Sequence, residues 1–336
     1  MTKSVWDFCC FGDCFAVDLI EIKAPDFDLA MTLDSGQVFH WEKSGDGFIG
    51  TIGDQAIYIE QRGSQLQVGG GKLECLKHSS LHDTVSHYFA VDHSLDEIGA
   101  SFPNDPAMNA ARNFCRGLRI IRQPLWECLA TFICSSMKQV THIRQISKKL
   151  RERFGEPLKI DPPSPRLRWG GAITMFTFPS AERIAASSEM ELRKCALGYR
   201  AKNLLATARH IGSGDVDLVT LAELSDLDLR ERLCALPGVG AKVANCVMLF
   251  AYERLRAFPI DVWIERVLRE KYFPRARRLN AARLRAFTEE YFGTHGGYAQ
   301  QYLFHHARMK TKIQRKPKSG GLSLCRACDN VSVLNS

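Results

Sequence analysis

The hydrophobic pattern of the first 115 residues is that of short strands and turns. Four runs rich in β-branched and aromatic residues are separated by Gly, Asp or Ser, as strands are when turns join them. These runs lie at 37–41, 47–52, 56–60 and 65–68. Residues 81–89 have apolar positions at helical spacing, and 103–112 are expected to open another helix. The pattern predicts an antiparallel sheet with helices over residues 1–115.

From Pro124 onward the pattern is helical almost throughout. The run 124–134 begins with proline at a first-turn position and is apolar on most faces, which predicts a buried helix. Prolines at 161–165 indicate a loop, and Ser180 is placed to cap the next helix. The expected fold is therefore α+β, with a sheet domain over 1–115, a mostly helical region over 116–310 and a basic tail over 311–336.

The stretch LPGVGAKVANC at 236–246 predicts two helices joined by a tight turn. Pro237 stops the incoming helix because it has no N–H to donate. Gly238 and Gly240 can take positive φ and carry no Cβ that would keep a partner away. Amides of the turn and of the new helix then point outward and can hold a phosphate. This is a helix-hairpin-helix over 228–250, in which Gly238, Val239 and Gly240 would bind a nucleic-acid backbone without reading its bases.

Lys242 and Asp261 are the candidate catalytic pair. Lys242 lies in the first turn of the second hairpin helix, where the helix dipole and nearby basic groups favour its neutral, nucleophilic amine. Such an amine can form a Schiff base with a sugar carbon. Asp261 follows Pro259 and is placed to cap a helix at 262–268, from where its carboxylate could stabilise a cationic sugar. Taken singly, a solvated lysine and a plain N-cap are the commoner alternatives.

Composition and charge agree with a globular, DNA-binding protein. Of 336 residues 45% are hydrophobic and 24% charged, and the formal net charge of +8 suits a polyanionic partner. Twelve scattered cysteines indicate a reducing compartment without structural disulfides. The pair Cys325 and Cys328 is half of a metal site without a second half, so no metal and no cofactor are expected. The sequence has no run of eighteen apolar residues and no secretory pattern in its first twenty.

At this point the chain resembles a known family. The hairpin motif followed by FPIDVWIERV at 258–267 is similar to the helix-hairpin-helix, Gly/Pro-rich loop and Asp motif of a DNA glycosylase superfamily. Four further motifs narrow the resemblance to the 8-oxoguanine DNA glycosylase/AP lyase branch: LDSGQVFHW at 33–41, FICSS at 132–136, LGYRA at 197–201 and YAQQYLF at 298–304. The motifs stand in the family's order from about residue 20 to about 310.

The resemblance implies an N-terminal domain similar to a TATA-binding-protein half-fold and a set of base-reading residues. Gly36 would offer its backbone carbonyl to a purine N7–H that only the oxidised base carries. Cys246 and Phe304 would pack on the two faces of the flipped base. Gln300 would bond to its Watson–Crick edge, since an extruded base is read by stacking and by that edge. From base rates alone Cys246 and Phe304 would be core residues.

The resemblance also assigns contacts to the opposite strand, and here the sequence departs from the family. Met137, Lys138 and Gln139 stand where asparagines fill the gap left by the flipped base. Tyr199 would stack at this wedge and Arg200 would bond to the orphaned cytosine, whereas His142 replaces a second cytosine-reading arginine. Trp263 replaces a histidine near a phosphate. These departures predict weaker discrimination of the opposite base.

The sequence thus predicts a bifunctional glycosylase that excises 8-oxoguanine from duplex DNA through a Lys242 Schiff base, followed by β-elimination. The alternatives are a monofunctional alkylbase DNA glycosylase, which would generally lack the hairpin lysine, and a non-catalytic protein that binds damaged DNA. The expected partner is double-stranded DNA containing oxidised guanine. We expect a monomer without membrane association that acts inside the cell with the genome, in the nucleus or in the bacterial cytoplasm and nucleoid.

Overall fold

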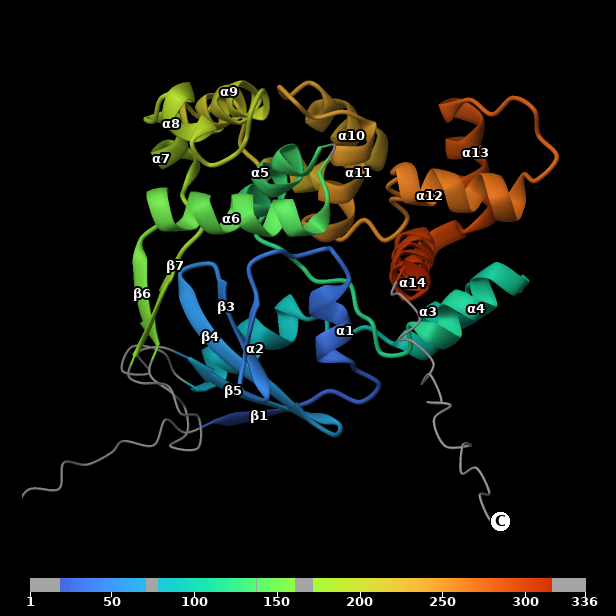
Figure 1. Ribbon diagram of the computed structural model, residues 1–336, viewed down its shortest axis with the longest axis horizontal. Helices are drawn as coiled ribbons and strands as arrows, with labels where there is room; N and C mark the ends of the chain where they lie inside the picture. Colours follow the sequence, from blue (N-terminus) through green and yellow to red (C-terminus); the bar gives the residue numbers. More distant parts are fainter. Residues whose placement is uncertain (1–18, 71–77, 137, 161–171, 316–336) are drawn as a thin grey trace, which may run out of the picture.

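The computed structural model of the protein describes residues 19–70, 78–136, 138–160 and 172–315. Its N-terminal part is a five-stranded antiparallel sheet in the order β1-β5-β4-β3-β2 (Figure 1). The strands are β1 Ile20–Lys23, β2 Glu42–Ser44, β3 Gly47–Ile52, β4 Gln55–Arg62 and β5 Gln65–Gly70. Three of the four predicted runs are strands, and the predicted α+β class is confirmed.

The predicted strand at 37–41 is wrong. The backbone carbonyl of Gln37 accepts a hydrogen bond from the Gln123 side chain at 2.8 Å, and not from a neighbouring strand. The Gln37 side chain is itself fully buried, donates to the Arg119 carbonyl at 2.8 Å and accepts from the Ile121 amide at 2.8 Å. The segment 37–41 is therefore an irregular, buried stretch. Its hydrogen bonds join the sheet domain to residues 119–123.

Alternation along β4 gives the sheet two buried faces. Ile57 and Ile59 point to one face, where they pack with helix α2 (His78–Tyr88), and Ala56 and Tyr58 point to the other. A two-stranded hairpin, β6 Pro157–Ile160 and β7 Ile173–Phe176, covers that second face through Ile160. The sequence analysis did not predict β1, β6 or β7, because each is a short strand of four residues. The predicted tail at 311–336 is wrong at its start, because residues 311–315 belong to the last helix, α14 (Gly296–Arg315). Residues 316–336, with Cys325 and Cys328, and the predicted loop at 161–165 lie outside the described residues.

The rest of the described chain is helical. The N-terminal helices are α1 Leu29–Asp34, α2 His78–Tyr88, α3 Leu95–Ala100 and α4 Pro106–Phe114. The following helices are α5 Leu125–Ser135, α6 Val140–Phe154, α7 Ala181–Ala185, α8 Glu189–Arg193, α9 Arg200–Gly212, α10 Asp226–Cys234, α11 Ala241–Phe250, α12 Val262–Val267, α13 Ala281–Tyr291 and α14 Gly296–Arg315. Short 3-10 turns lie at Thr220–Glu223 and Gly293–His295, and a π turn at Leu268–Tyr272 continues α12. The predicted cap at Ser180 is confirmed, since its side chain accepts the Arg183 amide.

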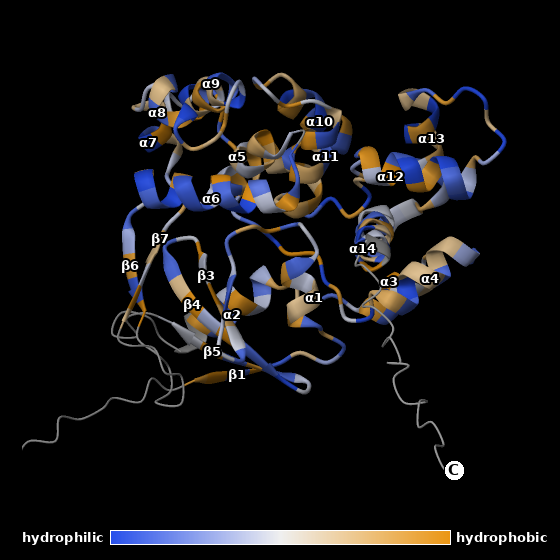
Figure 2. Ribbon diagram, in the orientation of Figure 1, coloured by the Kyte–Doolittle hydropathy of each residue, from blue (hydrophilic) through white to orange (hydrophobic). Residues whose placement is uncertain are grey.

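Helix α5 is the centre of the helical region. All of its residues from Glu127 to Ser135 are buried, and it packs against α6, α9 and α11. Figure 2 shows α5 mostly hydrophobic and α6 hydrophilic along much of its length, as expected for a central and a peripheral helix. Helix α14 packs on α4 and α12 and so lies between the N-terminal part and the last helices (Figure 1). Among the described helices none is long and apolar enough to span a bilayer.

Candidate active site

The hairpin between α10 and α11 has the predicted turn, with one difference. Gly238 has φ +81°, and a Cβ there would lie 2.7 Å from Cβ of Asn203, so this position requires glycine. Gly240 instead has φ −97° and caps α11 with extended backbone. No side chain caps this helix, and Gly238 and Gly240 are exposed. The amides at the start of α11 are therefore open to a phosphate, whereas Val239 is buried and its amide donates to the Leu236 carbonyl at 3.1 Å.

Lys242 is held against α5 at the start of α11. Its Nζ lies 3.5 Å from Oγ of Ser135 and 5.0 Å from the centre of the Phe132 ring, and the side chain is half-buried. The Ser135 hydroxyl and the Phe132 ring thus fix the position of the amine. Cys246 lies one helical turn further on the same face and is buried. Ser135 and Phe132 were not predicted to contact Lys242, because their part of the sequence is distant and reads as core.

Asp261 caps α12 as predicted. Its Oδ1 accepts hydrogen bonds from the amides of Trp263 at 3.0 Å and Ile264 at 2.8 Å. Burial raises the pKa of this carboxyl from 3.8, and the two amides and Lys242 oppose that rise. Lys242 and Asp261 both act on the pKa of the Cys246 thiol, which burial raises, so all three groups lie close together.

Gly36 and α14 pack against each other. Gly36 has φ +89°, and a Cβ there would lie 3.2 Å from the Phe304 ring. Gln301 fixes this turn by donating to the Ser35 carbonyl at 3.1 Å. Gln300 is only 5% exposed, and its Oε1 has no hydrogen-bond partner in the described structure. Since buried amides are almost always bonded, this oxygen indicates a site for a polar ligand.

Comparison with known proteins identifies this arrangement. Residues 19–129 match the model of the 8-oxoguanine DNA glycosylase N-terminal domain, and residues 130–290 match the HhH-GPD superfamily of base excision DNA repair proteins. The chain belongs to the 8-oxoguanine DNA glycosylase/AP lyase family. An N-glycosylase/DNA lyase of Arabidopsis thaliana is 29% identical over 85% of this chain and 78% of its own length. One of Saccharomyces cerevisiae is 27% identical over 85% and 84%.

Solved structures agree with this family membership. The 8-oxoguanine glycosylase/lyase of Clostridium acetobutylicum, bound to duplex DNA with cytosine opposite 8-oxoguanine, has a TM-score of 0.76 and 27% identity, covering 88% of this chain and 99% of that one. A 3-methyladenine DNA glycosylase of Archaeoglobus fulgidus has a TM-score of 0.70 at 18% identity, covering 86% and 98%. At that identity the second likeness concerns the fold alone.

The family's opposite-strand residues are distributed around the starts of α6 and α9. Met137 lies outside the described residues, and Lys138, Gln139 and His142 are exposed at the N-terminal end of α6. Tyr199 is 62% exposed, and its stacking on DNA stays a prediction. Arg200 is 5% exposed, and its guanidinium donates to the Ser136 carbonyl, with Nε at 2.7 Å, and to the Leu197 carbonyl at 3.2 Å. Its predicted bond to cytosine stays a prediction and requires release from Ser136.

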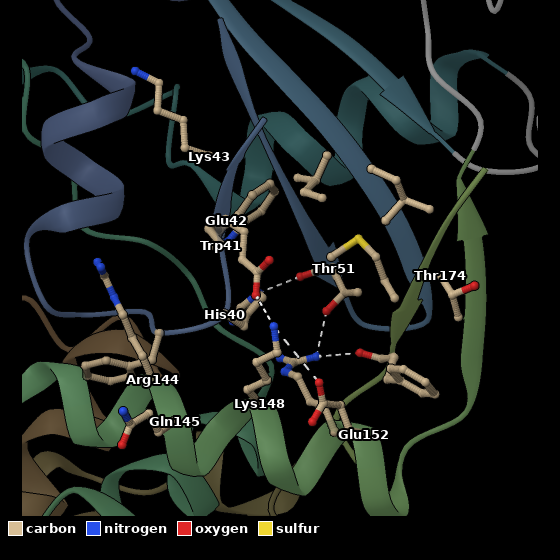
Figure 3. A pocket seen from close by; sticks show the side chains of 16 residues that line it. His40, Trp41, Glu42, Lys43, Thr51, Arg144, Gln145, Lys148, Glu152 and Thr174 are labelled. Carbon is tan, nitrogen blue, oxygen red and sulfur yellow. Dashed lines mark hydrogen bonds and ion pairs between the residues drawn. The ribbon is translucent and has the colours of Figure 1, made fainter. Parts of the chain in front are cut away.

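A separate pocket of this glycosylase lies beside the sheet, and neither Lys242 nor Asp261 lines it. It measures about 440 Å³ and is bordered by α6, the 39–43 segment and β7. Figure 3 shows His40 and Thr51 at its floor, where buried hydrogen bonds and ion pairs close the space. The groups at its floor bond to one another, so we assign this pocket no part in the chemistry.

Proposed function

We propose that this protein is a bifunctional DNA glycosylase that removes 8-oxoguanine from duplex DNA and then cleaves the strand, with Lys242 as nucleophile and Asp261 as its electrostatic partner. The observation that carries this proposal is the placement of Lys242 at the start of α11 and Asp261 at the start of α12, beside the buried Cys246. Lys242 and Asp261 come from different helices, and the influence of both on Cys246 supports their assignment as the catalytic pair.

The chemistry follows from this geometry. Once the lesion is flipped out, the Lys242 amine forms a bond to C1′ while the glycosidic bond breaks and its electron pair leaves with the base. The Asp261 carboxylate stabilises the positive charge that develops on the sugar. Loss of a proton from nitrogen and opening of the sugar ring give a Schiff base. Removal of a C2′ proton then expels the 3′ phosphate, and water releases the lysine.

Base reading in this proposal uses the wall formed by Gly36 and α14. Cys246 and Phe304 would enclose the base, and the unpaired Oε1 of Gln300 would accept from its Watson–Crick edge. The exposed amides of the hairpin would hold the phosphate backbone. The reaction as drawn needs no cofactor. The partner is duplex DNA with oxidised guanine, which places the protein with the genome; a monomeric state stays a prediction.

The test is covalent trapping. Incubation with a duplex containing 8-oxoguanine opposite cytosine and borohydride should yield a protein–DNA adduct, and Lys242→Gln should abolish it. Lys23→Gln, which removes an exposed lysine from β1 at the far edge of the sheet, should leave the adduct unchanged. An adduct that persists in Lys242→Gln would assign the nucleophile elsewhere. Excision that needs added alkali to break the strand would favour a monofunctional enzyme.

A further inference from the structure

Arg308 lies beside the base-reading residues although nothing in the sequence singled it out. It is on α14, one turn after Phe304, and only 6% of it is exposed. Its guanidinium carbon is 5.6 Å from the centre of the Phe304 ring. A Cβ added to Gly36 would lie 3.0 Å from its Nη1, closer than to any other atom. A donor of Arg308 and the backbone of Gly36 are therefore direct neighbours.

Asp34 anchors this arginine. Nη2 of Arg308 donates to the Asp34 backbone carbonyl, and the Asp34 carboxylate is 3.6 Å away. The same carboxylate also receives Arg144 at 2.9 Å and Lys312 at 3.8 Å, so one negative charge faces three positive ones. Burial lowers the pKa of Arg308 below its ordinary value, but a guanidinium stays charged at neutral pH.

The donors of Arg308 are not all used. Its Nε is buried and has no hydrogen-bond partner in the described structure, and the contacts to Asp34 run through Nη2. An unpaired Nε alone does not indicate a ligand, since Arg119 and Arg151 share this feature. The unpaired Oε1 of Gln300, on the same helix, does indicate a polar ligand, and Arg308 beside Gly36 is placed to supply that ligand with a donor.

We propose that Arg308 is a specificity-determining residue that donates a hydrogen bond to the C8 carbonyl of the oxidised base. Oxidation changes two neighbouring positions of guanine: N7 becomes a donor and C8 gains a carbonyl acceptor. The Gly36 carbonyl and the Arg308 guanidinium offer an acceptor and a donor side by side, which complements that edge. Undamaged guanine has an acceptor at N7 and only C–H at C8, so it would leave both groups unpaired.

This inference rests on the proposed function, since it requires the flipped base to lie against Gly36 and Phe304. It differs from a purely structural role, in which Arg308 would only hold Phe304 and the turn at Asp34. A structural role would affect all ligands of the pocket alike. A contact to C8 would affect only bases that carry an acceptor there.

The experiment measures binding without chemistry, in Lys242→Gln protein, to duplexes that differ in one nucleotide: 8-oxoguanine, guanine or a tetrahydrofuran abasic analogue. Arg308→Met should reduce the preference for 8-oxoguanine over guanine roughly ten- to a hundredfold, as expected for one buried hydrogen bond to a charged group. The affinity for the abasic duplex should not change. Lys312→Met removes another cation at Asp34 from an exposed site and should leave the preference intact.

An unchanged preference in Arg308→Met, or a parallel loss for all three duplexes, would overturn the inference. If that variant does not fold, 8-thioguanine in the duplex provides the test with Arg308 in place, because sulfur is a weak acceptor. Binding at least about tenfold weaker than that of 8-oxoguanine supports the C8 contact, and equal binding contradicts it. Failure of the protein with Lys242 intact to form the borohydride adduct would instead remove the proposed function, so the two failures are distinguishable.

Discussion

Asp261 has two roles that a single substitution can separate. As a cap it satisfies two amides of α12, and as a carboxylate it would stabilise the cationic sugar. Asparagine keeps the capping oxygen but not the charge. We expect Asp261→Asn to slow base excision about 10²–10³-fold in single-turnover assays. Because burial raises the pKa of Asp261, its ionised form costs stability at neutral pH, and thermal melting of the variant should show equal or higher stability.

Asp261→Ala is the control, since it removes cap and charge together and should cost about 0.5–2 kcal/mol of stability. Equal excision by the asparagine variant and the unsubstituted protein would show that the charge of Asp261 is not needed.

The pH dependence of excision should report the same carboxyl. Excision requires ionised Asp261, and the folded-state pKa lies above the ordinary 3.8, so the rate should fall with decreasing pH at a higher pH than for an exposed aspartate. The effect of falling pH on folding stability has the opposite sign to its effect on the excision rate. The penalty for ionised Asp261 is present at neutral pH and is relieved as pH falls through the raised pKa toward 3.8. Single-turnover rates from about pH 4 to 8 measure the first effect, and Asp261→Asn should lack this acid limb.

At the residue scale, the sequence identified those functional residues that stand in a short, recognisable motif. Lys242 and Asp261 each stand at a helix start that local signals mark. Ser135 and Arg308 could not be found in this way, because their partners are 107 and 274 residues distant along the chain. From the sequence alone, an arginine near the end of a long helix is expected to be solvated. Only the fold shows that Arg308 is buried beside Asp34.

The hairpin is the element on which DNA binding depends, and its two glycines allow a matched comparison. Gly238→Ala places a Cβ at φ +81° and 2.7 Å from Asn203, so we expect a loss of about 2 kcal/mol or more. Gly240→Ala meets no atom within 4 Å at an ordinary φ and should cost less than about 1 kcal/mol. Its methyl group would stand where the phosphate approaches, so it should weaken duplex binding with little effect on urea denaturation. Equal stability losses for the two variants would contradict this account.

The start of α6 is the element expected to set opposite-base preference. His142 is exposed there, and Arg200 is bonded to the Ser136 carbonyl, so no described arginine is free at the predicted cytosine site. We expect the protein to excise 8-oxoguanine opposite each of the four bases with rates that differ little. His142→Arg should restore a preference for cytosine, worth up to about 1–3 kcal/mol for a good bidentate contact. Lys149→Arg, on the same helix and exposed, is the control. A strong cytosine preference before any substitution would contradict the prediction.

Helices could be predicted where the hydrophobic period continues over many residues. Short strands were harder to predict because they contain too few residues to show a period. The helix at 124–134 is confirmed within one residue at each end as α5, and the helix-hairpin-helix predicted over 228–250 is confirmed as α10 and α11, which span 226–250. The run 37–41 has strand-like residues, yet tertiary hydrogen bonds to Gln123 and Arg119 use its polar groups. A proline-rich stretch of sequence stands between β6 and β7, so the two strands could not be paired from the sequence.

For the whole molecule, a buried ion pair joins the sheet domain to the helical region. Glu127 of α5 pairs with Arg151 of α6, and both are less than 10% exposed. Arg151 also donates to Thr51 of β3 at 2.7 Å and to the Phe176 carbonyl at 3.2 Å. His40 lies 3.3 Å from Glu127, and burial and Arg151 lower its pKa well below 6.5. The sequence analysis did not predict this network because its members come from five separate segments.

The network leads to a prediction about cohesion of the two parts. Arg151→Met leaves the Glu127 carboxylate buried without its cation, which should cost about 3–5 kcal/mol and lower the melting temperature by about 5–15 °C. Adding Glu127→Gln to that variant removes the unpaired buried carboxylate and should recover most of the lost stability. Arg269→Met breaks a half-exposed pair with Glu265 and should cost less than about 1 kcal/mol. If Arg151→Met and Arg269→Met have the same melting temperature, the ion pair adds no stability and apolar packing alone holds the sheet on the helices. Since Gly36 belongs to the N-terminal part and Lys242 to the helical region, loosening this junction should also reduce excision while leaving binding by the hairpin intact.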